Sequence, residues 1–213
     1  VSLLVHYYSI SYMKEDNSFN RFFIYTNFFT FSMLLIVLSN NFLQLFIGWE
    51  LVGLSSYLLI GFWIKKDSAI KANYKAFLVN RVGDVGLLLG LCLILLIYNT
   101  TDYNQIFQIK NTINMDRLDI FGYSTNALSV ICLLLFIGAM AKSAQVPLQF
   151  WLPDSMEGPT PISALIHAAT MVTAGIYMVA RLSPLYELSQ DVLMFILYVG
   201  SITAFFLGLV ALV

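Results

Sequence analysis

The chain has 213 residues, of which 59% are hydrophobic and only 11% are charged, and its mean hydropathy is +0.80. This composition excludes an ordinary soluble domain, and the formal net charge of -1 gives no reason to expect a nucleic-acid partner. Cys92 and Cys132 lie apart in apolar runs, without Cys or His neighbours. That isolation predicts two small core residues rather than a metal site, an Fe–S cluster or a disulfide.

The apolar runs predict an all-α polytopic membrane protein with about six transmembrane helices, one of them broken. Each run approaches or exceeds the ~20 residues that cross a bilayer as a helix. A fragment at residues 1–12 is too short to cross, and we expect it to be the end of a helix that begins outside this sequence. The expected spans are residues 22–39, 41–64, 76–98, 125–151, 161–182 and 192–213.

The basic residues divide unequally between two sets of loops. One set carries Lys14, Arg21, Lys65, Lys66, Lys71 and Lys75, and the other carries Lys110, Arg117 and Arg181. The positive-inside rule therefore predicts that the first set faces the cytoplasm or the matrix. The longest loop, residues 99–124, is polar without a strong period, and we expect a short surface helix or an extended cover there.

Lys142 is the most informative residue, because it stands between two uncharged stretches, residues 120–141 and 143–153. A charge at that depth is costly in lipid, so it must face protein or water and is expected to have a function. Helix-breaking residues follow it directly. Broken backbone at membrane depth is tolerated only where it is buried in protein or lines a cavity, so this pairing is typical of an intramembrane ion path.

The break itself can be located from Pro147, which lacks a backbone donor and clashes with the carbonyl of Ser143 in a helix. We expect the helix over residues 125–151 to break between Lys142 and Leu148. The freed carbonyls should be satisfied by polar groups or water, since lipid offers no donors.

Glu50 is the second charge inside an apolar span, on a helix rich in Gly and Ser that permits close helix packing. It is either a titrating group on a proton route or a structural carboxylate bonded to a neighbouring helix. Arg81 and Asp84 are three residues apart on the next span, so they lie on one helix face and can pair. An anchoring role and a functional role are both open for these two residues.

His167 lies in a span that is otherwise uncharged. Thr160, Ser163, His167 and Thr170 follow one stripe of a helix with 3.6 residues per turn. Hydroxyls and trapped water can carry protons to and from an imidazole, so the stripe favours a proton relay over a satisfied core histidine. We expect His167 to face the protein interior with Ser163 and Thr170, at the level of Lys142.

The remaining polar and aromatic residues are expected to have structural roles. Asp154 and Glu157 flank a Pro-rich helix start, where a carboxylate is stabilised by the helix dipole. Trp49, Trp63 and Trp151 need no more than packing or interface anchoring. The sequence contains no Gly-rich nucleotide loop, P-loop or cysteine cluster, so we expect no cofactor in this chain.

Four motifs resemble the antiporter-like membrane subunits of respiratory complex I, the NADH–ubiquinone oxidoreductase chain 5 family. The resemblance covers essentially the whole chain, and the motifs are long, ordered and specific. They are Gly48-Trp49-Glu50-Leu51-Val52-Gly53-Leu54, Asn80-Arg81-Val82-Gly83-Asp84, the stretch from Lys142-Ser143-Ala144-Gln145 through Trp151-Leu152-Pro153-Asp154, and Met156-Glu157-Gly158-Pro159-Thr160-Pro161-Ile162-Ser163-Ala164-Leu165-Ile166-His167.

The resemblance implies that residues 1–213 form one antiporter-like transmembrane domain, half of an inverted-repeat fold. Its first helix would be cut, and the second repeat and the C-terminal helices would lie outside this sequence. Two positions depart from the family pattern. Leu51 stands where the family usually has Gly, which should alter packing beside the preceding glutamate. Gln149 and Phe150 stand where many members have His-Pro, so we assign no proton role there.

The resemblance further implies that Glu50 and Lys142 are the coupled proton-translocating pair. Asp84 would lie near the pair, Arg81 would support it, and His167 would belong to the central hydrophilic axis. Close together, Glu50 and Lys142 would stabilise each other's charge, and separated, the lysine could give up its proton. A change in their separation would then load and release one proton without bond chemistry in this chain.

The implied function is that of a proton-translocating membrane-arm subunit of complex I, which couples NADH:ubiquinone electron transfer to proton pumping. NADH, FMN, Fe–S clusters and ubiquinone would then be held by partner subunits. The expected partners are other membrane-arm subunits, the lipid bilayer and, if the gene is split, a chain carrying the remainder of chain 5. The Phe-, Tyr-, Ile- and Asn-rich composition suits an AT-rich organelle genome, which favours the mitochondrial inner membrane over a bacterial plasma membrane. The alternatives are a subunit of a multi-subunit sodium/proton antiporter and a purely structural piece of the membrane arm.

Overall fold

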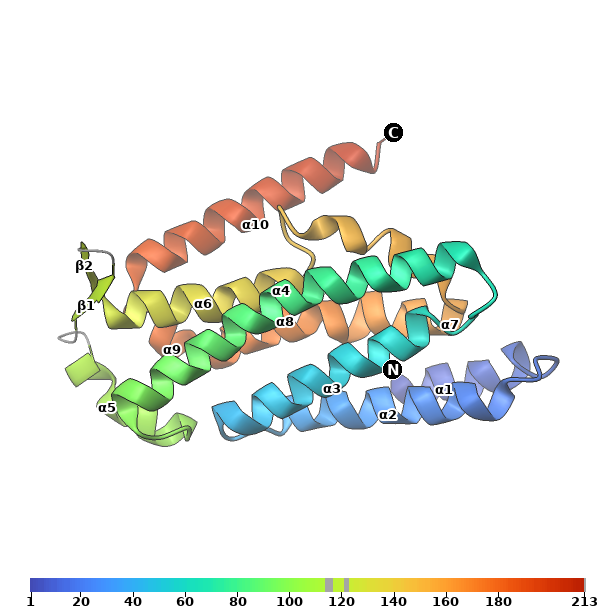
Figure 1. The fold of residues 1–213 in the computed structure, drawn as a ribbon, viewed down its shortest axis with the longest axis horizontal. Helices are drawn as coiled ribbons and strands as arrows, with labels where there is room; N and C mark the ends of the chain where they lie inside the picture. The colour runs from blue at the N-terminus through green and yellow to red at the C-terminus, as the bar shows by residue number, and fades with distance from the viewer. Residues whose placement is uncertain (114–116, 121–122, 213) are drawn as a thin grey trace.

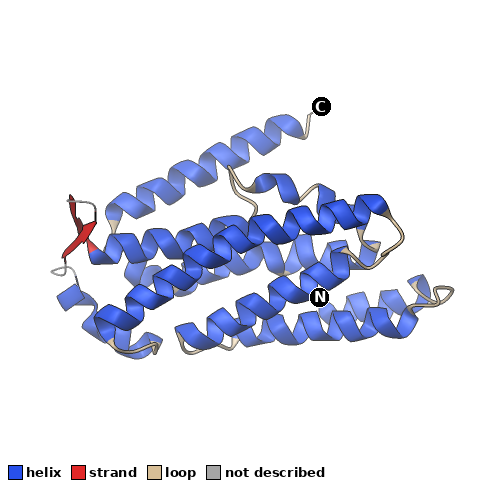
Figure 2. Ribbon diagram, in the orientation of Figure 1, coloured by secondary structure: helices blue, strands red, loops and turns tan. Residues whose placement is uncertain are grey.

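The computed structural model describes residues 1–113, 117–120 and 123–212, and almost all of them form helices (Figure 2). A single small hairpin stands at one end of the helical bundle among the described residues. The helices in chain order are α1 (Ser2–Tyr12), α2 (Phe19–Val37), α3 (Phe42–Ile60), α4 (Asp67–Tyr98), α5 (Tyr103–Ile113), α6 (Ala127–Lys142), α7 (Thr160–Ser163), α8 (Met171–Arg181), α9 (Ser183–Tyr186) and α10 (Gln190–Val210). The other elements are strands β1 (Arg117–Ile120) and β2 (Tyr123–Asn126), 3-10 helices η1 (Gln149–Trp151) and η2 (Asp154–Glu157), and the π-helix η3 (Ala164–Ala169).

The long helices run side by side, and the chain turns at alternate ends of the bundle (Figure 1). In the described part of the chain, five stretches are long and apolar enough to cross a membrane: α2, α3, α4, α10 and the segment Thr160–Arg181. The shorter α6 is equally apolar and lies against α4. The predicted all-α polytopic membrane fold is therefore confirmed.

A tight turn joins α2 to α3. Asn41 is the N-cap of α3, and its side-chain oxygen accepts a 2.6 Å hydrogen bond from the backbone N–H of Gln44. The long polar loop contributes both of the expected structures, the surface helix α5 and the extended β1–β2 hairpin. The helix is anchored by Tyr103, whose ring packs edge-on against Phe42 and whose buried hydroxyl lies 3.4 Å from that of Ser39. Burial raises the pKa of Tyr103 to about 12.

Helix α4 begins earlier than the hydropathy pattern predicts, at Asp67 rather than at residue 76. Hydropathy marks only the part of a helix that lies in lipid, whereas backbone hydrogen bonding continues into the polar turns outside it. Asp67 in the first turn favours this extension, because a carboxylate near a helix N-terminus interacts well with the helix dipole. The additional turns contain Lys71 and Lys75, which the hydropathy pattern assigns to a loop.

Helix α6 ends at Lys142, as the prediction of a break between residues 142 and 148 requires. Ala144 then adopts a left-handed conformation with φ of 50°, and the Val146–Pro147 peptide bond is cis. The carbonyl of Ala141 accepts a 3.0 Å hydrogen bond from the indole N–H of Trp151. The expectation that polar groups satisfy the freed carbonyls is confirmed at this position.

A second irregularity lies in the segment expected to be one continuous span over residues 161–182. After the short helix α7, the backbone forms the π-helix η3, and α8 starts only at Met171. π-helical turns are rare and often accompany functional sites. Because each residue turns through a smaller angle in a π-helix, side chains spaced for an α-helix no longer form one stripe here.

Small residues bring α4 and α6 into close contact. The missing side chains of Gly86 and Gly90 leave room for Ile137 and Leu135 on α6, and Gly138 faces α4 in the same way. A methyl group on Gly83 would overlap the side chain of Ala141. Such small-residue interfaces are the usual way in which transmembrane helices approach closely.

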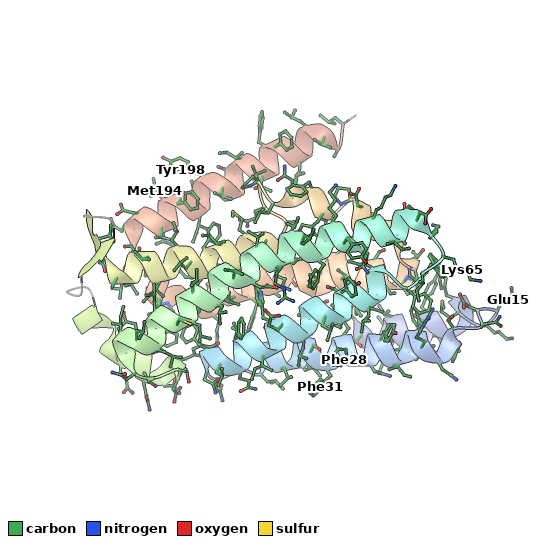
Figure 3. The ribbon with its side chains drawn as sticks, viewed as in Figure 1. Glu15, Phe28, Phe31, Lys65, Met194 and Tyr198 are labelled. Atoms are coloured by element: carbon green, nitrogen blue, oxygen red, sulfur yellow. The ribbon has the colours of Figure 1, made fainter. Side chains whose placement is uncertain are left out.

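The outer surface of the bundle is apolar. Figure 3 shows Phe28 and Phe31 pointing outward from α2, and Met194 and Tyr198 pointing outward from α10. Cys132 is buried as expected, but Cys92 is exposed on α4. An apolar residue of a membrane helix can face lipid as well as the protein core, so isolation in an apolar run does not predict burial in the protein.

We predict that Gly83→Ala destabilises the α4–α6 contact, by roughly 1–3 kcal/mol for an overpacked site. Gly200→Ala on α10 is the matched control, because nothing lies within 4 Å of the added methyl group. In the control, the intrinsic helix preference of Ala over Gly, about 1 kcal/mol, is unopposed. Thermal unfolding of the detergent-extracted native protein measures the stability of both variants. Equal unfolding midpoints for Gly83→Ala and Gly200→Ala would contradict the close contact between α4 and α6.

Candidate functional site

Lys142 is the last residue of α6, and its side chain is only 1% exposed. Its Nζ lies 3.7 Å from Oδ1 of Asp84 on α4, so the two form an ion pair inside the bundle. The ammonium also sits at a helix C-terminus, where the macrodipole favours a cation. Among the described residues Nζ has no hydrogen-bond partner, so the ion pair is held at more than hydrogen-bond distance.

Trp49 on α3 connects both members of this pair. Its indole N–H donates a 2.8 Å hydrogen bond to Oδ1 of Asp84, and Nζ of Lys142 lies 5.7 Å from its ring centroid. The side chain is fully buried. The indole therefore offers a hydrogen bond to the anion and a π face to the cation, and both interactions are favourable when water is excluded.

The expectation that Trp49 only packs or anchors is wrong. One signal in the sequence pointed to this contact, because a buried tryptophan usually places its N–H on an acceptor. The identity of the acceptor depends on the rotation of α3 against α4, which the sequence does not specify.

Glu50 and Arg81 form a second ion pair, with 2.5 Å between Oε2 of Glu50 and Nη1 of Arg81. Their side chains are 28% and 42% exposed, so this pair lies nearer the surface than the pair of Lys142. Arg81 also lies over the ring of Phe77, 5.0 Å from its centroid. The site thus contains one buried and one partly exposed ion pair, and α4 contributes one residue to each.

The observed pairs differ from those expected, which were Glu50 with Lys142 and Arg81 with Asp84. A step of one residue turns a helix by about 100°. With Trp49 directed at Asp84, Glu50 is therefore directed elsewhere, and it meets Arg81. Arg81 and Asp84 could pair with each other on α4, but both instead pair with residues of other helices.

Gly53 provides space for the charge. A methyl group built on it would lie 3.0 Å from Nζ of Lys142 and 3.9 Å from Oδ2 of Asp84. Gly53 is one turn beyond Trp49 on α3, so the two residues share a helix face. A glycine is therefore needed at position 53 because a larger side chain would occupy the space of the Lys142 ammonium.

A cavity of about 10 Å³ lies beside Arg81 and Asp84, one member of each ion pair. Its walls include Arg81, Asp84 and Gly53, together with the polar side chains of Ser56 and Asn80. The volume corresponds to roughly one water molecule, and the lining supplies the polar partners that a water needs. Polar groups of α3 and α4 therefore line a small space beside one member of each pair.

His167 faces the protein, as expected, but its neighbours differ from the predicted stripe. Its Nε2 lies 3.1 Å from the hydroxyl of Ser155, and its ring centroid lies 6.3 Å from that of Trp151. The hydroxyl of Thr170 instead donates to the carbonyl of Leu165. The π-helical geometry of η3 explains the difference, because an α-helical spacing does not hold there. Trp151 thus separates His167 from the end of α6.

Asp154 and Glu157 do more than interact with a helix dipole. Asp154 pairs with Lys75 at 2.5 Å and Glu157 pairs with Lys66 at 3.2 Å, which ties η2 to the start of α4. All four side chains are at least partly exposed, so these ion pairs are screened and individually weak. They fix the broken segment after Lys142 without belonging to the buried site.

Residues 39–213 match the family described as NADH:quinone oxidoreductase/Mrp antiporter, TM, and residues 1–23 match the N-terminus of complex I chain 5. The chain is 56% identical over 211 residues to NADH-quinone oxidoreductase subunit L of Neisseria meningitidis, covering 98% of this chain and 31% of the relative. It is 54% identical over 208 residues to NADH-ubiquinone oxidoreductase chain 5 of Marchantia polymorpha, covering 97% and 31%. The chain therefore spans about a third of the length of these curated relatives.

Solved structures share the fold. A chain of the Mrp complex from Dietzia sp. DQ12-45-1b matches with a TM-score of 0.61 and 34% identity, over 75% of this chain and 16% of that one. An archaeal respiratory complex, the membrane-bound sulfane sulfur reductase, matches with a TM-score of 0.69 and 22% identity, over 79% and 32%. The likeness expected from the sequence motifs is confirmed, and the chain belongs to the NADH:quinone oxidoreductase/Mrp antiporter transmembrane family.

Proposed function

We propose that this chain is the proton-translocating part of an antiporter-like membrane-arm subunit of respiratory complex I. The observation that carries the proposal is a lysine that is 1% exposed, in a membrane helix, paired with a carboxylate on another helix. Ionisable groups inside a membrane are costly, and they mark ion and proton pathways in transport proteins. The 51–56% identity to complex I subunits supports the assignment.

The two ion pairs suggest how a proton is moved. Arg81 and Asp84 are one turn apart on α4, and in the observed state each has a partner on another helix. Protonation of Glu50 would free Arg81, which could then compete for Asp84. Lys142 would lose its counter-ion in a buried position, a condition under which a lysine gives up its proton. In this scheme Glu50 and Lys142 act as a coupled pair through Arg81 and Asp84.

His167 would receive or relay the proton on the other side of Trp151. Its Nε2 contacts the hydroxyl of Ser155, and its buried Nδ1 has no hydrogen-bond partner among the described residues. An imidazole with one unoccupied ring nitrogen can accept a proton there and release one at the other nitrogen. In this proposal the route runs from Glu50 through Lys142 to His167 in η3.

The rest of the reaction would take place in partner subunits. We propose that NADH, FMN, Fe–S clusters and ubiquinone are held there, and that this chain contributes charge movement without redox chemistry. Other membrane-arm subunits would be its neighbours, and a separate chain would supply the remainder of chain 5 if the gene is split. The composition favours the mitochondrial inner membrane, with a bacterial plasma membrane as the alternative.

A sodium/proton antiporter subunit is the second candidate, favoured by the 34% identity to a chain of the Mrp complex. The two proposals differ in what accompanies the protein. Flavin, Fe–S clusters and quinone reductase activity in the purified native complex would support complex I. Their absence, together with other antiporter subunits in the same complex, would support the second candidate.

We predict that Lys142→Met in the assembled complex lowers NADH-driven proton uptake into vesicles by about tenfold or more. Removing one partner of a buried pair leaves the other uncompensated, at a cost of about 3–5 kcal/mol. Asp84→Asn should resemble Lys142→Met more closely than Glu50→Gln does, because Asp84 is the direct partner of Lys142. Lys14→Met, which removes an exposed lysine, is the matched control. Normal proton stoichiometry in both Lys142→Met and Glu50→Gln, with assembly intact, would refute the mechanism.

We predict that Trp49→Phe slows proton uptake by roughly tenfold, because an unmet hydrogen bond to a buried carboxylate costs about 1–3 kcal/mol. The phenyl ring retains the apolar volume but has no N–H to donate to Asp84. Trp63→Phe is the control, since Trp63 contacts Lys66 at the surface through its ring alone. Pumping rates, normalised to the amount of assembled complex, distinguish the variants, and equal rates would mean that Trp49 only packs.

A further inference from the structure

A second polar feature lies at the C-terminal end of α3, beyond the residues that contact the buried ion pair. A pocket of about 300 Å³ is formed between α2, the end of α3 and the first turns of α4. Arg21 is the charged member of its described lining, and Tyr25, Tyr57 and Tyr74 contribute aromatic rings. Ile64 and Tyr74 are both exposed, so the pocket opens to the outside of the bundle.

Arg21 carries a charge that no acidic side chain neutralises among the described residues. Its Nη2 donates to the carbonyl of Phe62 at 3.1 Å and to the hydroxyl of Ser18 at 3.3 Å. The guanidinium lies over the ring of Phe62, 4.8 Å from its centroid, and its buried Nε has no hydrogen-bond partner in the described part of the chain. These contacts fix the orientation of the guanidinium, and a planar, oriented guanidinium is well suited to a phosphate.

Asn73 on α4 provides an independent indication of a ligand. Its side chain is only 8% exposed and lines the same pocket, and its Oδ1 has no hydrogen-bond partner among the described residues. A buried amide oxygen without a donor is rare and costs free energy. A ligand hydroxyl in the pocket would satisfy it, while its phosphate meets Arg21.

The position of the pocket indicates a lipid. Arg21 lies in the first turn of α2 and Phe62 just after the end of α3, where both spans leave the apolar region. Tyrosines are enriched at this level of a membrane. Ile24 and Leu78 expose apolar side chains on the adjoining faces of α2 and α4, where acyl chains could lie. Lys65 projects from the same end of the bundle (Figure 3).

We propose that this pocket binds one anionic glycerophospholipid whose headgroup carries a free glycerol hydroxyl, of the phosphatidylglycerol type. Its phosphate pairs with Arg21, its headgroup hydroxyl donates to Asn73, and its acyl chains cover α2 and α4. Basic pockets between transmembrane helices on the matrix or cytoplasmic side bind such headgroups. A choline headgroup has no donor for Asn73, so the pocket discriminates against it. The proposal is independent of the proton-translocating role.

The test uses the native complex that contains this chain, delipidated and titrated with phosphatidylglycerol, with bound lipid counted by native mass spectrometry. Arg21→Gln and Asn73→Ala should each weaken retention of one phosphatidylglycerol by about tenfold or more. Leu58→Trp fills the pocket while leaving Arg21 in place, and it should abolish that retention. Lys14→Gln removes an exposed positive charge outside the pocket and should leave the count unchanged.

Three outcomes would overturn the proposal. Retention in Leu58→Trp equal to wild type would place the lipid elsewhere, even if Arg21→Gln failed to assemble. Equal retention of phosphatidylcholine would indicate a general lipid layer without headgroup recognition. Displacement of the lipid by millimolar inorganic phosphate would indicate a site for small anions only. Loss of retention with unchanged NADH oxidation would support the proposal separately from the pumping mechanism.

Discussion

The structure depends on keeping the charge of Lys142 inside a membrane protein. Burying an ion costs several kcal/mol even after relaxation, and a pair is tolerated only with good geometry and additional polar contacts. Three helices meet this requirement together, since α6 brings the ammonium, α4 the carboxylate of Asp84, and α3 the indole of Trp49. The break after Lys142 places the cation at a helix C-terminus, where the dipole favours it. Glycines at the contacts let the helices approach closely enough.

The sequence predicts those features that depend on local cost. A lysine in an uncharged membrane helix is costly however that helix packs, so Lys142 could be identified as part of a buried site. A proline inside a helix is also costly in any packing, so the position of the break before Pro147 could be predicted. The partners could not be predicted in the same way. Which carboxylate meets Lys142 depends on the rotation of α3 against α4, and one residue changes that direction by about 100°. The order of Trp49 and Glu50 along α3 therefore decides which of them reaches Asp84.

Two further differences between the predicted and the observed helices arise because a hydropathy pattern reports contact with lipid and not backbone geometry. Helix α4 begins at Asp67, more than two turns before its apolar part, and the π-helix that contains His167 has no hydropathy signature. The hydroxyl pattern and the family resemblance both singled out His167, whereas its contact with Ser155 is seen only in the fold. Motifs thus identify the residues of a buried polar site more reliably than their pairing.

The unequal burial of the two ion pairs has a consequence for coupling. The pair of Glu50 and Arg81 is partly exposed, whereas Lys142 and Asp84 are almost inaccessible. Electrostatic effects between nearby charges are large where water is excluded and small where it screens them. A protonation change at Glu50 would therefore be felt at the buried pair, because α4 contributes one residue to each pair. We therefore propose that the partly exposed pair is the input and that the buried lysine is the group that responds.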